Sequence, residues 1–170
     1  MTARRVVIMG VSGCGKSTLG RALAARLGLR YVEGDELHPP ENVARMAAGV
    51  ALTDADRRGW LQAVAHELAA GGGTGTVVAC SALRRRYRDQ LRAAAPDLRL
   101  VHLQGPRALL EQRLATRQGH YMPPSLLQSQ LDTLEPPATD ERALTLDFAE
   151  PAEQLCEQAA QWLTHTPSVA

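Results

Sequence analysis

One glycine-rich segment near the start of the chain contains its only lysine. Lys16 lies near the end of the P-loop-like run at residues 10–17, Gly-Val-Ser-Gly-Cys-Gly-Lys-Ser. The other 18 of the 19 Lys and Arg residues are arginine. The run matches the pattern G-x-x-x-x-G-K-[ST] of a phosphate-binding loop. A compact ammonium on a thin stem can reach the β- and γ-phosphates through a ring of amides, whereas a planar guanidinium is too broad. The sequence therefore predicts a nucleotide phosphate site.

The residues on either side of this loop have the pattern that a P-loop requires. Arg5–Met9 is a short run rich in β-branched apolar residues, which predicts a buried parallel strand. Ser17–Leu27 has helical spacing, and Gly28 follows it as a stop signal. The glycines let backbone N–H groups turn inward, and the start of the helix adds positive potential. A glycine-rich turn that binds nothing is the alternative interpretation.

The P-loop pattern assigns roles to individual residues and predicts ATP and Mg²⁺ as cofactors. Lys16 is expected to neutralise charge on the β- and γ-phosphates, and Ser17 to ligate Mg²⁺ through its hydroxyl. Thr18 is expected to contact the α-phosphate. The residues predicted to bind the nucleotide are Gly10, Val11, Ser12, Gly13, Cys14, Gly15, Lys16, Ser17 and Thr18.

Composition limits the class of protein and its surroundings. A net charge of +1 and an aromatic content of 4% argue against a nucleic-acid partner or a membrane-surface role. Three widely spaced cysteines, Cys14, Cys80 and Cys156, favour reduced thiols over a disulfide framework. The first apolar run is too short for a signal peptide or a membrane span, so we expect a cytoplasmic protein without a membrane partner.

Strand and helix patterns alternate along the rest of the chain. Further strands are predicted at residues 30–33, 76–80, 98–103 and 144–147, and further helices at about 41–48, 53–70, 82–95, 106–118 and 151–163. This alternation predicts an α/β fold with a five-stranded parallel sheet and helices on both faces, in a single domain over residues 1–170. Ligands should gather at the C-terminal ends of the strands. Helical spacing predicts core positions at Trp60, Leu61, Val64, Leu68 and Trp162.

A segment rich in Gly and Pro interrupts the alternation before the last strand. Residues 119–124, Gly-His-Tyr-Met-Pro-Pro, precede a short helical stretch at 125–134 and then Glu135-Pro136-Pro137. A helical hairpin bounded by Gly and Pro predicts a mobile lid at about 119–142. Arg113 and Arg117 share a helix face that leads into this lid, and we expect them to stabilise a transferring phosphoryl group as it closes. An exposed helix face is the alternative.

The positions of the acidic residues indicate which class of P-loop protein this is. A GTPase needs an Asn-Lys-x-Asp segment to read guanine, and the chain has no second lysine. A motor or AAA-type ATPase needs an acidic residue at the end of an apolar strand. The third and fourth predicted strands end instead in Cys80-Ser81 and Gln104-Gly105, and the acidic residues Glu33 and Asp35 follow the second strand. This is the layout of a small-molecule kinase.

Several side chains are candidates for catalysis and substrate binding. Asp35 is expected to orient or deprotonate the acceptor hydroxyl, and Glu33 to hold a water bound to Mg²⁺; a helix cap and a solvated carboxylate are the alternatives. Arg84 and Arg88 lie four residues apart on a predicted helix. Two cations on one face suit a carboxylate substrate, and a solvated basic surface is the alternative.

Motifs in register along most of the chain resemble the gluconokinase family of P-loop small-molecule kinases. The match runs from about residue 5 to about residue 150, and its D-x-L-H-P, C-S-A-L and G-H-[FY] blocks are much more specific than the P-loop alone. The matching segments are Glu33–Pro39, Asn42, Arg45-Met46, Gly49, Leu52–Arg57, Trp60-Leu61, Cys80–Arg84, Tyr87–Asp89, Arg117–Tyr121, Leu134–Pro137 and Asp140–Arg142.

This resemblance implies transfer of the ATP γ-phosphoryl group to the 6-hydroxyl of D-gluconate, a small sugar acid, by a homodimeric enzyme. It also implies substrate contacts at Asp35, His38, Arg45, Arg84, Arg88 and His120. The chain departs from the usual family pattern with Glu33 in place of Asp, Cys14 in place of Ser, and arginines 45 and 84 in place of Lys. A kinase for shikimate or a nucleoside monophosphate, and a regulatory ATP-binding module without catalysis, are the alternatives.

Overall fold

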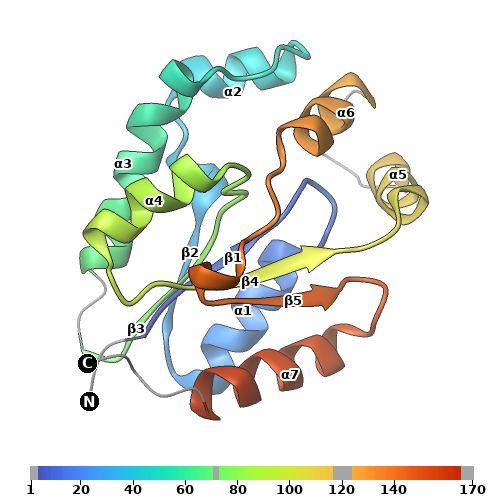
Figure 1. The fold of residues 1–170 in the computed structure, drawn as a ribbon. Coiled ribbons are helices and arrows are strands. Elements are labelled where there is room, and N and C mark those ends of the chain that lie inside the picture. The colour runs from blue at the N-terminus through green and yellow to red at the C-terminus, as the bar shows by residue number, and fades with distance from the viewer. Residues whose placement is uncertain (1–3, 71–72, 117–123, 166–170) are drawn as a thin grey trace.

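A five-stranded parallel sheet forms the centre of the molecule. The computed structural model describes residues 4–70, 73–116 and 124–165. The strands lie in the order β2-β3-β1-β4-β5, and each neighbouring pair is parallel (Figure 1). Their bounds are β1 (Arg4–Met9), β2 (Arg30–Glu33), β3 (Gly75–Ala79), β4 (Arg99–Gln104) and β5 (Ala143–Asp147). The predicted α/β fold is therefore confirmed, and each predicted strand is present within one or two residues of its expected bounds.

Helices cover both faces of this sheet. In Figure 1, α1 (Lys16–Leu27) and α7 (Ala152–His165) lie on one side, and α3 (Asp54–Ala70) and α4 (Arg85–Ala94) lie on the other. Three further helices, α2 (Pro40–Ala47), α5 (Arg107–Thr116) and α6 (Pro124–Thr133), lie toward the end of the sheet where the strands terminate. Among the described residues, none of the helices combines the length and the apolar character needed to cross a membrane.

The alternation of side chains along β1 explains why the sheet needs helices on both faces. Val6 and Ile8 belong to the core that includes α1 and α7, whereas Val7 and Met9 belong to the core that includes α3 and α4. All four side chains are 0% exposed. Successive strand residues point to opposite faces, so a strand covered on both sides reads as one continuous apolar run.

The core positions predicted on α3 and α7 are also confirmed. Trp60, Leu61, Val64 and Leu68 are buried under the α3 and α4 face of the sheet. Trp162 is partly buried and packs against the opposite core. These positions share one side of their helices, as the sequence spacing indicated.

A short 3₁₀ helix that the sequence did not predict, η1 (Gly34–Leu37), follows β2 and carries the candidate catalytic aspartate. Its first residue packs so closely on β3 that a Cβ atom at Gly34 would lie 2.2 Å from the carbonyl oxygen of Ala79. The Gly34 carbonyl accepts a hydrogen bond of 2.8 Å from the buried Trp60 indole. A second 3₁₀ helix, η2 (Thr139–Glu141), precedes β5. The single-domain organisation with a lid stays a prediction, and residues 117–123 of that segment lie outside the described residues.

Candidate active site

The loop between β1 and α1 has the conformation that an anion-binding P-loop requires. Gly13 and Gly15 adopt φ angles of 86° and 99°, which side chains with a Cβ rarely adopt. Lys16 begins α1 and folds back so that its Nζ donates to the carbonyl oxygen of Val11 at 3.0 Å. The free N–H groups at the start of α1 and the Lys16 ammonium therefore face the same space.

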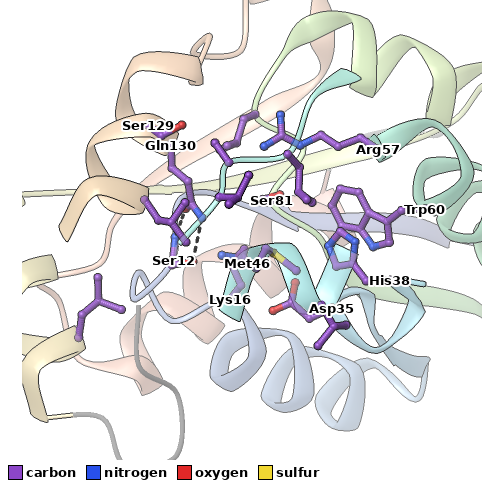
Figure 2. A pocket seen from close by; sticks show the side chains of 17 residues that line it. Ser12, Lys16, Asp35, His38, Met46, Arg57, Trp60, Ser81, Ser129 and Gln130 are labelled. Carbon is purple, nitrogen blue, oxygen red and sulfur yellow. Dashed lines mark hydrogen bonds between the residues drawn. The ribbon is translucent and has the colours of Figure 1, made fainter. Parts of the chain in front are cut away.

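Two cavities meet at this loop. The first, about 350 Å³, is lined by residues 12–19 and by Asp35, Arg113, Phe148, Glu150, Ala152 and Leu155; we call it the P-loop cavity. The second, about 300 Å³, extends from the loop to α2, α3 and α6 and reaches the Trp60 indole; we call it the Trp60 cavity (Figure 2). Ser12, Lys16 and Asp35 line both cavities. Ligands bound in the two cavities can therefore meet at this boundary, next to the Lys16 ammonium and the Asp35 carboxylate.

Glu33 is held at the edge of the P-loop by two hydroxyl donors and a long ion pair. Its Oε2 accepts hydrogen bonds from the Ser17 hydroxyl at 2.5 Å and the Tyr31 hydroxyl at 2.7 Å. Arg21 lies 3.9 Å from the same oxygen. Burial, together with the bond to Glu33, raises the pKa of Tyr31 to about 12, so this phenol keeps its proton and donates. The strand residue Glu33 thus fixes the orientation of the Ser17 hydroxyl in the first turn of α1.

Asp35 projects from η1 between the two cavities. Figure 2 shows its carboxylate close to Lys16 on one side and to the His38 ring on the other. The exposed side chain follows Gly34, whose packing against Ala79 and bond from Trp60 leave little freedom to the backbone. The carboxylate is therefore accessible to solutes, although its backbone is anchored to the core.

His38 is positioned by a stack and by an amide. Its ring lies 4.1 Å from the Trp60 ring, with an angle of 14° between the two planes. Burial lowers the pKa of His38 to about 4, so the ring is neutral near pH 7. The Asn42 amide nitrogen lies 3.2 Å from Nδ1, and an amide nitrogen can only donate, so Nδ1 is the acceptor and Nε2 carries the proton. His38 can therefore offer one N–H donor to a ligand.

Arg57 is a cation of the Trp60 cavity that we did not identify from the sequence. It lies in the first turns of α3 and lines the cavity together with Asp35 and His38 (Figure 2). One guanidinium nitrogen donates to the Tyr87 hydroxyl at 2.8 Å, and the group lies 5.3 Å from the centre of the Tyr87 ring. The only signal in the sequence was its place at the end of the segment Leu52–Arg57, which resembles the gluconokinases; its exposed neighbour Arg58 lies just outside that segment.

Arg88 does not lie at either cavity, contrary to our expectation. It is 0% exposed and donates to the Glu141 carboxylate at 2.7 and 3.1 Å and to the Ala82 carbonyl oxygen at 2.9 Å. Helix α4 begins at Arg85, so Arg84 is an extended N-cap residue and does not share a helix face with Arg88. Arg84 lines neither cavity. A direct contact between Arg88 and a substrate is therefore not available in this structure.

The remaining predicted side chains lie in several places. Arg45 is exposed and pairs with Asp56 at 2.5 Å, outside both cavities. Arg113 lines the P-loop cavity, where it donates to the carbonyl oxygens of Gly13, Cys14 and Phe148 at 3.3, 3.4 and 2.9 Å. In this structure Arg113 therefore supports the backbone of the phosphate loop. Arg117 and His120 lie outside the described residues.

Comparisons with known proteins agree with this geometry. A protein-family model described as an AAA domain matches residues 6–137. A gluconokinase from Gluconobacter oxydans is 50% identical over 141 residues, which cover 81% of this chain and 79% of the relative. The Trp60 cavity and most of the P-loop cavity fall within the matched range, whereas Phe148, Glu150, Ala152 and Leu155 of the P-loop cavity lie beyond it.

Two solved structures have the same fold along nearly the whole chain. A sugar kinase from Janibacter sp. HTCC2649, solved without ligand, has a TM-score of 0.91 and 47% identity, and the match covers 99% of each chain. A gluconokinase from Sinorhizobium meliloti 1021 has a TM-score of 0.87 and 46% identity, over 95% of this chain and 91% of that one. The chain thus belongs to the P-loop family of the matched model and, within it, to the gluconokinases.

Proposed function

We propose that this protein phosphorylates D-gluconate on its 6-hydroxyl with ATP as the donor. The observation that carries the proposal is that two cavities meet at Ser12, Lys16 and Asp35, which gives a donor site and an acceptor site a common boundary. Relatives that are named gluconokinases and match most of the chain support this acceptor over shikimate or a nucleoside monophosphate. The carboxylate at the boundary supports catalysis over a purely regulatory role.

The P-loop cavity is suited to the triphosphate of ATP. Its backbone amides and the Lys16 ammonium would neutralise phosphate charge, and Arg113 donates to the carbonyl oxygens of Gly13 and Cys14 in the same loop. The Ser17 hydroxyl beside the Glu33 carboxylate provides the hard oxygen donors that Mg²⁺ prefers. When bound there, Mg²⁺ would supply additional positive charge to the phosphates, and Tyr31 would hold Glu33 in place.

The Trp60 cavity is suited to a small polyhydroxy acid. Asp35 is placed to accept a proton from the acceptor hydroxyl or to orient it, since it lines the boundary with the P-loop cavity. The neutral His38 can donate to a sugar hydroxyl, and Arg57 supplies a cation for the carboxylate end of the substrate. A substrate with these groups at its two ends would be fixed with one hydroxyl toward Lys16.

The oligomeric state and the location in the cell are part of the same proposal. We assign a homodimer from the resemblance to the family. The described cysteines Cys14, Cys80 and Cys156 are free and buried, which supports a reducing compartment such as the cytoplasm.

A panel of acceptors tests the proposal directly. Purified protein is incubated with ATP and Mg²⁺ and with D-gluconate, D-glucitol, shikimate or AMP, and ADP formation is followed in a coupled assay. We expect turnover with D-gluconate well above the rate without acceptor. D-Glucitol should react poorly, because it has the same hydroxyls but lacks the carboxylate that Arg57 would bind.

The Arg57→Met variant serves as the control for this panel. It should lose most of the preference for D-gluconate over D-glucitol, since a charge-assisted pair contributes more than a neutral hydrogen bond. Turnover of shikimate or AMP in place of D-gluconate would refute the assigned acceptor. ATP binding without transfer to any of the four compounds would refute the assignment as a kinase for such acceptors.

Replacement of Asp35 by asparagine tests the assigned role of the carboxylate. We expect Asp35→Asn to lower kcat by about a hundredfold, because general-base catalysis typically contributes that much or more. The affinity for ATP, measured by calorimetry, should remain close to that of the wild type. A variant that loses ATP binding but retains transfer would contradict the assigned role, and Glu36→Gln, which alters the next carboxylate along η1, should leave kcat unchanged.

A further inference from the structure

One side chain of α6 bridges to the phosphate loop with both ends of its carboxamide. The backbone N–H of Ser12 donates to Oε1 of Gln130 at 2.7 Å, and Nε2 of Gln130 donates to the Ser12 hydroxyl at 3.2 Å (Figure 2). The two residues are 118 positions apart in the sequence. The contact therefore joins two segments that only the fold brings together.

This bridge lies at the boundary between the two cavities. Ser12 lines both of them, and Gln130 lines the Trp60 cavity beside Lys16 and Asp35. A phosphoryl group that moves from a nucleotide to an acceptor has to pass this boundary. The Gln130 carboxamide is placed next to that path, with its carbonyl oxygen occupied by a loop amide and its nitrogen able to donate.

The C-terminal end of α6 is fixed to a different part of the molecule. The backbone N–H of Glu135, just after α6, donates to the carbonyl oxygen of Leu83 at 2.7 Å, and the Glu135 carboxylate accepts from the backbone N–H of Arg85 at 3.0 Å. These bonds tie the C-terminal side of the helix to the start of α4. The Gln130 contact thus links α6 to the phosphate loop, a little more than one helical turn before that anchor.

We propose that Gln130 is a positioning residue for phosphoryl transfer, which holds α6 against the phosphate loop and keeps water from the boundary between the cavities. The inference rests on the proposed kinase function and assigns a role to a residue outside the P-loop. When water replaces the acceptor hydroxyl, its oxygen bonds to the γ-phosphorus as the bond to the β–γ bridging oxygen breaks. The products are then ADP and inorganic phosphate. If water reaches the boundary between the cavities, the amount of ADP formed therefore exceeds the amount of phosphorylated acceptor.

The test compares Gln130→Met with a matched variant on the same helix. Methionine keeps the length of the side chain but forms neither bond with Ser12. Gln128→Met is the control, because Gln128 is exposed, bonds to Arg107 and Asp132, and lines neither cavity. ADP and phosphorylated acceptor are measured separately, together with kcat, the KM for each substrate and the melting temperature.

We expect Gln130→Met to lower kcat for transfer by about tenfold, as the loss of a pair of hydrogen bonds near reacting groups suggests. The ratio of ADP to phosphorylated acceptor should rise above one, while the melting temperature stays within a few degrees of the wild type. Gln128→Met should keep the wild-type ratio and kcat. A folded Gln130→Met protein with a ratio of one and a kcat within twofold of the wild type overturns the inference.

Two further variants keep the test decisive if methionine disturbs the fold. Gln130→Glu keeps an oxygen for the Ser12 N–H but replaces the donor by a negative charge, so the KM for ATP should rise and kcat should fall further than in Gln130→Met. Ser12→Ala removes only the hydroxyl partner, and in the double variant with Gln130→Met its effect should disappear, because both changes break the same link. Wild-type behaviour of Gln130→Glu, or additive effects in the double variant, would count against the role.

The outcome is separable from that of the proposed function, because wild-type transfer to D-gluconate is measured first. If another acceptor is the true substrate, the same ratio is measured with that acceptor. If the wild type transfers to none of the acceptors, the rates of ATP hydrolysis of the wild type and Gln130→Met are compared, and equal rates overturn the inference.

Discussion

Replacement of Lys16 by alanine is expected to lower kcat by about a thousandfold or more, with ATP and D-gluconate both saturating. Loss of one preorganised charge-stabilising donor at a transition state commonly costs two to three powers of ten, and residues that neutralise charge on a transferring phosphoryl group contribute about as much or more. Lys16 lines both cavities and is the only lysine of the chain, so no neighbouring lysine can replace it. The rate is followed as ADP release and confirmed as phosphorylated acceptor.

Two companion variants separate this role from a general effect of charge. Lys16→Arg keeps the positive charge but should also be strongly impaired, because a guanidinium is broader than the ammonium that folds back to the Val11 carbonyl oxygen at 3.0 Å. Arg26→Ala removes one positive charge from the other end of α1, where it pairs with Glu157 on the surface, and should leave kcat near the wild-type value. Near-normal turnover of Lys16→Ala would refute the assigned role.

Replacement of Arg88 by methionine is expected to lower the free energy of unfolding by about 3–5 kcal/mol, the typical cost of leaving one partner of a buried ion pair alone. Both partners are inaccessible, since Arg88 is 0% exposed and Glu141 is 1% exposed. Burial by itself would raise the pKa of Glu141, but bonds from Arg88, from the Ala138 N–H and from Arg92 hold it at about 2. In the variant the Glu141 carboxylate loses its main partner. Urea denaturation measures the resulting decrease in the free energy of unfolding.

The same pair makes a prediction about acid stability. The pKa of Glu141 is lower in the folded protein than in the unfolded chain, so the pair contributes stability above pH about 4.5 and this contribution is lost as pH falls toward 2. Arg88→Met should show a flatter decline of stability over that interval. The double variant Arg88→Met/Glu141→Leu should recover much of the lost stability at neutral pH, because apolar replacement of both partners is often close to neutral.

A surface pair on the same helix is the control for this experiment. Arg85 pairs with Asp140 at 2.7 Å, but its side chain is 42% exposed and that of Asp140 is 65% exposed. Arg85→Met should lower the free energy of unfolding far less than Arg88→Met, because water and salt screen an exposed ion pair. An Arg88→Met protein that is as stable as Arg85→Met would show that the buried pair contributes little.

The sequence alone determined the phosphate loop and the framework that carries it. Residues 10–17 are contiguous, and the φ angles that Gly13 and Gly15 adopt are local properties of glycine. The strands and helices followed from patterns of period 2 and 3.6, and the buried positions of Trp60, Leu61, Val64 and Leu68 followed from the same spacing. These features depend on near neighbours in the chain, so they can be read without the fold.

Only the tertiary structure decided which polar side chains face the second cavity. The eighteen arginines are chemically alike, and their positions in the sequence do not reveal which one meets a buried carboxylate. Arg88 is paired with Glu141, 53 residues further along the chain, whereas Arg57 lines the cavity and Gln130 reaches the loop across 118 residues. Contacts between distant segments depend on how the helices and the sheet pack against one another, and no local pattern in the sequence encodes that packing.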